Sequence, residues 1–153
     1  MAGRKRKPDH LKIVSGTAQP CRMNPSAPTA NPGLPTPPAW LSERACELFN
    51  QVAATLDTMG IASPDHVHAL AMLASRLEEI EITTAVIEDL GRTYTTTTQS
   101  GDQMFRTRPE VGQRNEALRH AQSLLAEFGL TPAALGKVSA PGKRDENPFA
   151  ALG

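Results

Sequence analysis

The stretch SERACELFNQVAATLDTMGIASPDHVHALAMLASRLEEIEITTAVIEDLG, residues 42–91, decides the fold. In its first part, apolar residues from Ala45 to Met59 recur at the spacing of one stripe on a helix. Ser42 is a suitable N-cap, and Gly60 is a suitable C-terminal stop. These signals predict a helix from about Ser42 to Met59.

The second part of the stretch predicts a longer helix. Ser63-Pro64-Asp65 has the order of an N-cap, a proline in the first turn and an acid that favours the helix dipole. An apolar stripe continues from Val67 to Leu90, with either Val86 or Ile87 facing inward, and Gly91 follows. Because only a short loop separates the two helices, we expect an antiparallel helical hairpin with a long second helix.

The residues that follow change in character. Residues 92–107 contain Tyr94, a run of threonines and a Ser100-Gly101 turn signal, which together predict a small β-hairpin. A lone hairpin is marginal in water, so it needs either its own helices or another subunit as a neighbour. A third helix is expected at about 109–128 and a short fourth helix at about 132–138, so the fold class is mainly α.

Composition divides the chain into three parts. Residues 1–39 hold eight of the thirteen prolines and predict a disordered, basic, proline-rich arm. Residues 40–130 form the predicted helical core, and residues 131–153 form a short helix with a flexible C-terminal tail. Aromatic residues make up only 4% of the chain. A core this thin gains stability from further burial, so we expect an oligomer.

Charge is unevenly distributed although its sum is zero. Residues 40–135 carry seven arginines against thirteen acids, whereas residues 1–22 carry six basic residues against Asp9 alone. Basic side chains on an arm can contact phosphates, and the alternative is that they only solvate the tails. The candidate DNA contacts are Arg4, Lys5, Arg6, Lys7, Lys12 and Arg22, followed by Lys137, Lys143 and Arg144.

Signatures of catalysis and of metal binding are missing from the sequence. Residues 129–138 resemble a P-loop only superficially, because Val138 stands where a magnesium-binding Ser or Thr is required. His66 and His68 are two residues apart on a helix and make a poor metal pair. We therefore expect neither enzymatic activity nor a cofactor. No apolar run long enough for a membrane span and no signal peptide are present. Cys21 and Cys46 are expected to be free thiols.

The ordered set of landmarks resembles the phage terminase small subunits that lack an obvious N-terminal helix-turn-helix. It comprises the basic arm, the proline-rich approach to Trp40-Leu41, the long helix, the Tyr94 hairpin, RPEV at 108–111 and EFGLTPAALGKV at 127–138. Relatives commonly have an arginine soon after Gly-Leu-Thr-Pro. Here either Lys137 stands in for it or that contact is absent.

The resemblance implies a function. Such proteins form rings, here expected to contain roughly eight to twelve subunits, recognise a packaging site on double-stranded viral DNA, and deliver it to the large terminase subunit, which holds the ATPase and the nuclease. It implies a site of action in the host bacterial cytoplasm and no membrane partner. Two alternatives remain open: a dimeric helix-turn-helix regulator using residues 109–138, and an interaction scaffold with merely solubilising tails. Candidates to line a channel are Arg106, Arg108, Arg114 and Arg119.

Overall fold

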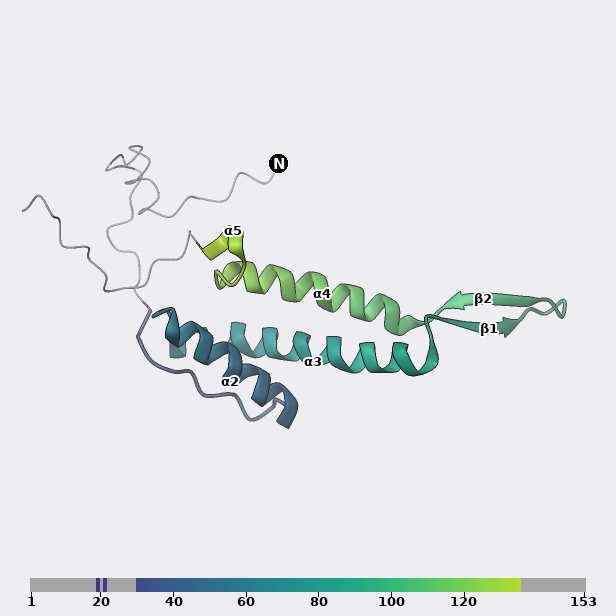
Figure 1. Cartoon of the computed structure of the whole chain (residues 1–153), viewed down its shortest axis with the longest axis horizontal. Coiled ribbons are helices and arrows are strands. Elements are labelled where there is room, and N and C mark those ends of the chain that lie inside the picture. The colour runs from purple at the N-terminus through teal and green to yellow at the C-terminus, as the bar shows by residue number, and fades with distance from the viewer. Residues whose placement is uncertain (1–18, 20, 22–29, 136–153) are drawn as a thin grey trace, which may run out of the picture.

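Helix α3 is the central element of a mainly helical structure, with α2 against one side and α4 against another (Figure 1). The computed structural model describes residues 19, 21 and 30–135. The elements are α2 (Glu43–Thr58), the 3-10 helix η2 (Pro64–His66), α3 (Val67–Leu90), β1 (Thr93–Thr97), β2 (Gln103–Thr107), α4 (Pro109–Glu127) and α5 (Pro132–Leu135).

The predicted helix starts are confirmed for α2 and shifted for α3. The Ser42 hydroxyl accepts a hydrogen bond from the Ala45 amide at 3.0 Å, as an N-cap does. Ser63 accepts from the Asp65 amide, but the turn that it begins is a 3-10 turn, and the α-helix begins at Val67. The His66 amide donates a hydrogen bond to the Ser63 carbonyl, three residues earlier, which is the hydrogen-bond pattern of a 3-10 helix.

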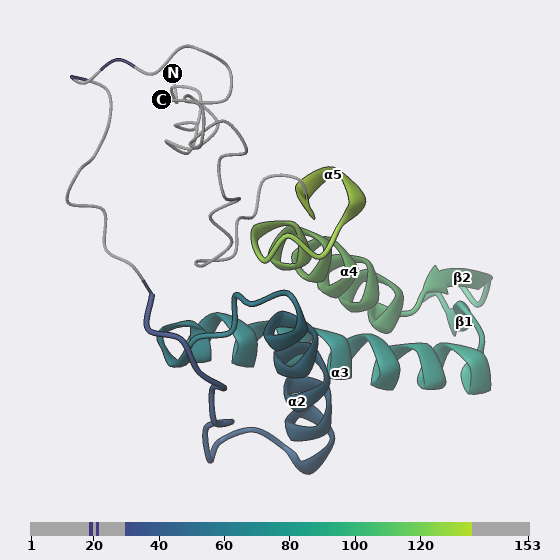
Figure 2. The same cartoon turned by 60° about the vertical axis from the view of Figure 1, so that its left-hand side comes forward.

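Helices α2 and α3 form the predicted antiparallel hairpin (Figure 1), and Figure 2 shows α2 packed across one side of α3. Arg44, in the first turn of α2, reaches Glu81 in the middle of α3, while the far end of α2 leads into the loop before α3. Between them lies the main core, in which Phe49 and Leu56 are completely buried. The stripe predicted from sequence is therefore the face that packs.

Helix α4 returns antiparallel to α3 and packs through small side chains. Its buried residues are Ala117 and Ala121, and α3 contributes Thr83 and Ile87 to the buried set, so Ile87 rather than Val86 faces inward. At the far end, the His66 ring meets the Phe128 ring edge to face, with centroids 6.1 Å apart.

Residues 30–41 run along the helical hairpin. The Gly33 amide donates to the Ala62 carbonyl at 3.2 Å, and Pro35 is buried. This approach brings Trp40 and Leu41 to the start of α2.

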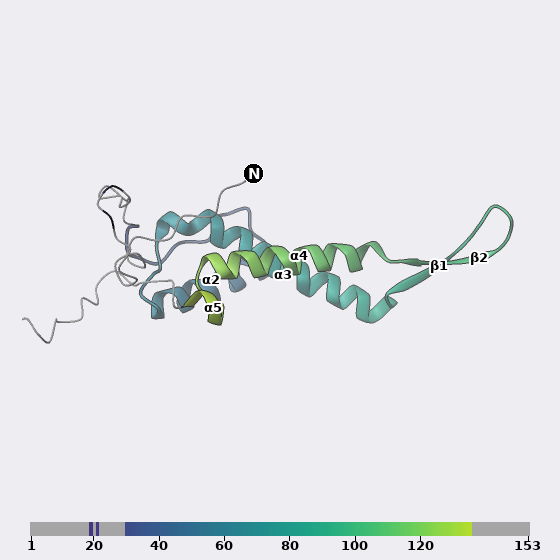
Figure 3. The same ribbon diagram turned by 90° about the horizontal axis from the view of Figure 1, so that it is seen from above.

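The β-hairpin projects from the end of the α3–α4 pair (Figures 1 and 3). Its strands are antiparallel, with Thr95 opposite Phe105 and Thr97 opposite Gln103. Gly91, with φ of 78° and ψ of 172°, turns the chain out of α3 in a conformation that is essentially restricted to glycine. All of β2 is exposed, so the chain's own helices do not cover the hairpin.

Candidate functional site

The nine residues predicted to contact DNA all lie outside the described residues. These are Arg4, Lys5, Arg6, Lys7, Lys12, Arg22, Lys137, Lys143 and Arg144. Their DNA contacts therefore stay a prediction. The structure describes residues 30–135, which lie between the N-terminal and the C-terminal groups of these residues in the sequence.

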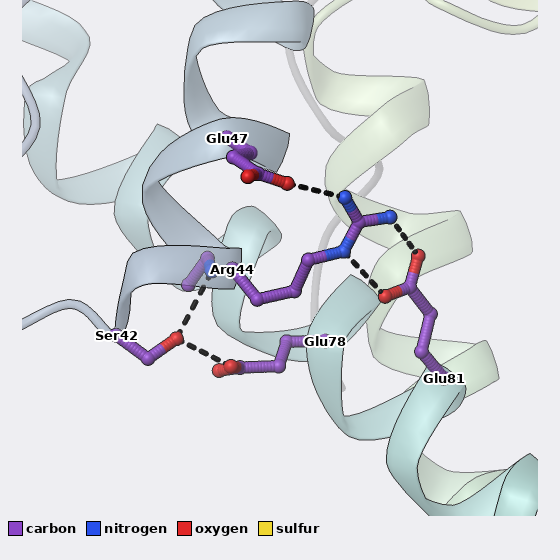
Figure 4. Close-up of polar contacts among 6 residues, drawn as sticks. Ser42, Arg44, Glu47, Glu78 and Glu81 are labelled. Carbon is purple, nitrogen blue, oxygen red and sulfur yellow. Dashed lines mark hydrogen bonds and ion pairs between the residues drawn. The ribbon is translucent and has the colours of Figure 1, made fainter.

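A charged network joins the start of α2 to the middle of α3 (Figure 4). Arg44 donates through Nε and Nη2 to the two carboxylate oxygens of Glu81, each at 2.8 Å, and it also pairs with Glu47. Ser42, while capping α2, donates to Glu78. Glu78 and Glu81 of α3 thus hold the start of α2 in position along α3.

This network shifts the acidities of its members. The Arg44 guanidinium hydrogen-bonds to Glu81 and lowers the pKa of that carboxyl below its ordinary value of 4.5, and the same contacts raise the pKa of Arg44. A bidentate geometry of this kind favours the charged forms of both partners. The network stabilises the fold and offers no reactive group.

A second anchor fixes the approach to α2. The Asp65 carboxylate accepts hydrogen bonds from the Asn31 backbone amide at 2.9 Å and from its side-chain amide, which lowers the Asp65 pKa below 3.8. Asp65 had been assigned only to helix initiation from the sequence. It also ties residues 30–41 to the loop between the helices.

The four arginines considered as channel-lining residues have different environments. Arg108 packs over the Tyr94 ring and donates to the Leu90 carbonyl at 3.2 Å, so it braces the hairpin base. Arg114 is half-buried. Arg106 and Arg119 are exposed, on β2 and α4 respectively. Of the four, these last two remain available for a partner.

An apolar groove of about 500 Å³ lies between α3 and α4 beside Trp40. Trp40, Met72 and Leu124 supply its apolar lining, Arg76 adds a cationic group, and His120 adds an imidazole. Trp40 is 62% exposed and Met72 is 53% exposed. The sequence had marked Trp40 only as a family landmark, because the groove forms from segments distant along the chain.

The hairpin presents a second exposed apolar group. Phe105 is 74% exposed, which is the largest value among the large hydrophobic side chains of the described residues. Because side chains alternate along a strand, Phe105 shares its face with Thr95 and Gln103, and that face carries no charge. The hairpin therefore exposes an aromatic side chain midway along β2, on an uncharged face.

The segment considered for a helix-turn-helix is incompletely described. Helix α4 packs along α3, and the described part of α5 covers one turn, Pro132–Leu135, while residues 136–138 lie beyond it.

Within residues 19, 21 and 30–135, no group of three potential metal ligands occurs, and Cys21 and Cys46 do not form a disulfide. In the same residues, no helix has the length and apolarity needed to cross a membrane.

A helical hairpin extended by a returning helix and a projecting β-ribbon defines a scaffold with interaction surfaces. A family model for the small subunit of phage terminase matches residues 45–145, which is more than half of the chain. The chain therefore belongs to the phage terminase small subunit family, whose role is in the packaging of phage DNA. No match was found among curated proteins or among solved structures.

The matched range has a consequence for the predicted sites. It contains α3, the hairpin, α4 and the second cationic cluster around Lys143, but it stops short of the N-terminal arm and of Trp40. The family model therefore does not cover the arm residues or Trp40, which lie before its first matched residue.

Proposed function

We propose that the chain assembles into a ring that binds viral DNA at the packaging initiation site and hands it to the large terminase subunit in the host cytoplasm. The large subunit supplies ATP hydrolysis and DNA cleavage, and this chain supplies recognition and regulation without catalysis. Family membership carries the packaging role. The proposals of ring assembly, DNA binding and delivery to the large subunit rest on the distribution of charge and on the exposed surfaces of the chain.

The observation that supports arm-mediated DNA binding is the sign of the body's charge. Residues 30–135 carry seven arginines against thirteen acids. Two of those arginines, Arg44 and Arg108, are engaged within the fold. A body with excess negative charge repels phosphates, so attraction to DNA must come from the cationic arms.

Removal of residues 1–22 tests this assignment. The deletion removes six cations, so we expect weaker DNA binding and a slope of log K against log salt that is shallower by up to about 5. A gel shift at several salt concentrations measures both quantities. The matched control keeps all 22 residues but replaces the six cations with glutamine, and it should behave like the deletion.

The outcomes separate charge from chain length. Equal loss in both variants supports phosphate contact by the arm. Unchanged affinity and slope in the deletion would overturn the assignment of the arm to DNA. Retained helicity by circular dichroism shows that the helical body has folded in each variant.

A further inference from the structure

We infer that the β-hairpin of one subunit docks into the Trp40 groove of the next copy of the chain, with Phe105, in the middle of β2, entering the groove. This inference rests on the proposed ring and names the surfaces that build it. The two side chains concerned, Phe105 and Trp40, are the two most exposed large hydrophobics of the described residues, at 74% and 62%.

The hairpin cannot fill its own groove. The groove lies beside Met72, Arg76 and Leu124, toward the end of the α3–α4 pair that joins α2 and α5. From Arg76 to the end of α3 is about 20 Å of helix, since each residue rises about 1.5 Å. The hairpin then continues away from that end (Figures 1 and 3). A second copy is required to bring the two surfaces together.

Charge on the two surfaces is complementary. Asp102, in the turn of the hairpin, is the only acid between Arg92 and Arg108. Arg76 is the permanently charged residue in the lining of the groove, and His120, also in the lining, lies 4.0 Å from Glu116. Arg76 is exposed, and neither it nor the Asp102 carboxylate has an ion-pair partner among the described residues. Docking of the hairpin brings the Asp102 carboxylate toward the Arg76 guanidinium.

The shape of the groove suits an aromatic side chain. A volume of about 500 Å³ with Trp40, Met72 and Leu124 around it offers both an aromatic face and flexible apolar contacts. Ser75 and Ser123, also in the lining, can bond to polar groups such as those of the threonines and Gln103 beside Phe105. Stacking against Trp40 gives the contact a defined orientation.

The arrangement of the surfaces favours a ring over a pair. The hairpin and the groove are different surfaces at separate places on the molecule, so the contact is head to tail, and repetition of a head-to-tail contact closes a ring or extends a filament. In a ring, each subunit makes the contact twice, once with its hairpin and once with its groove.

Trp40 provides the test because it is the only tryptophan in the chain. In the whole chain, we expect the fluorescence emission of Trp40 to be blue-shifted in the assembly and to move to longer wavelength on dilution. Phe105→Ser should give the long-wavelength emission at every concentration and a lower mass by native mass spectrometry. Helicity by circular dichroism should be unchanged, because Phe105 lies outside the core.

A matched control and a charge swap sharpen the result. Leu118→Ser changes another exposed hydrophobic residue, which does not line the groove, and should leave mass and emission as in the wild type. Asp102→Arg should weaken assembly, and adding Arg76→Asp should restore it by exchanging the charges. A swap without rescue would overturn the pairing of Asp102 with Arg76.

The failure of this inference is distinguishable from that of the proposed function. A ring that persists with unchanged Trp40 emission in Phe105→Ser overturns the docking and leaves the ring intact. A wild-type chain that stays monomeric at all concentrations overturns the ring itself, and the docking with it.

Discussion

At the residue scale, single polar side chains set the geometry between elements. Ser42 caps α2 and also bonds to Glu78 on α3, and Arg44 spans the same gap to Glu81 (Figure 4). Asp65 likewise joins residues 30–41 to the interhelical loop through Asn31. These contacts fix where one element lies along another, whereas the apolar core fixes only that they pack.

The Glu81 carboxylate makes a prediction about pH. Its pKa is lower in the folded chain than its ordinary 4.5, so the unfolded chain binds the proton first as the pH falls. The stabilising contribution is complete above 4.5 and is lost as the pH falls through the folded pKa. Glu81→Gln should therefore lower the melting temperature at neutral pH, and the difference from wild type should disappear in acid.

Thermal unfolding followed by circular dichroism at matched protein concentration measures this difference. Glu88→Gln is the control, because Glu88 is an exposed acid of the same helix with no ion pair among the described residues. Because the Arg44–Glu81 pair is exposed, the effect should be small and should weaken in high salt. A Glu81→Gln difference that persists in acid would contradict the assigned ion pair.

At the scale of elements, α4 approaches α3 closely because its buried positions are alanines. Ala117 is completely buried and Ala121 is 3% exposed. Ala121→Leu would force extra volume into this contact, and overpacking costs about 1–3 kcal/mol. Urea unfolding should show a lower free energy of unfolding.

A leucine elsewhere on α4 is the control for that experiment. Ala126→Leu changes the helix propensity by the same amount as Ala121→Leu. Because Ala126 is exposed, the new side chain lies outside the α3–α4 contact. Equal stability of the two variants would contradict the close packing of α4 at Ala121.

The hairpin is the element with the least support from its own chain. It is joined to α3 through Gly91, braced by Arg108 against Tyr94, and otherwise exposed. Two isolated strands are marginal in water, so the proposed docking into a neighbouring subunit would give the hairpin a surface to pack against.

At the scale of the whole molecule, the proposed ring predicts the mass of the assembly. Native mass spectrometry of the full-length protein should show a closed oligomer of roughly eight to twelve subunits. A discrete mass that stays constant over a range of concentrations supports closure. A dimer at every concentration would contradict the ring and favour a twofold regulator.

The sequence by itself determined the elements of this protein. The apolar stripes, Ser42, Ser63-Pro64 and the glycines at 60, 91 and 129 specify helices whose type and approximate bounds depend on local periodicity and capping. Threonine-rich residues and a Ser-Gly turn specify the hairpin in the same way. The start of α3 is an exception. Residues 64–66 form a 3-10 turn, and the choice between 3-10 and α-helical hydrogen bonds within one turn does not follow from the capping signals in the sequence.

Tertiary structure alone decided which residues meet. Trp40, Met72 and Leu124 are separated by long stretches of sequence, and only the packing of α2 and α4 on α3 brings them around one groove. Arg44 and Glu81 are likewise 37 residues apart, and Asp65 and Asn31 are 34 residues apart. Sequence periodicity reports the face that a helix buries, whereas contacts between distant segments depend on how the buried faces pack together in three dimensions.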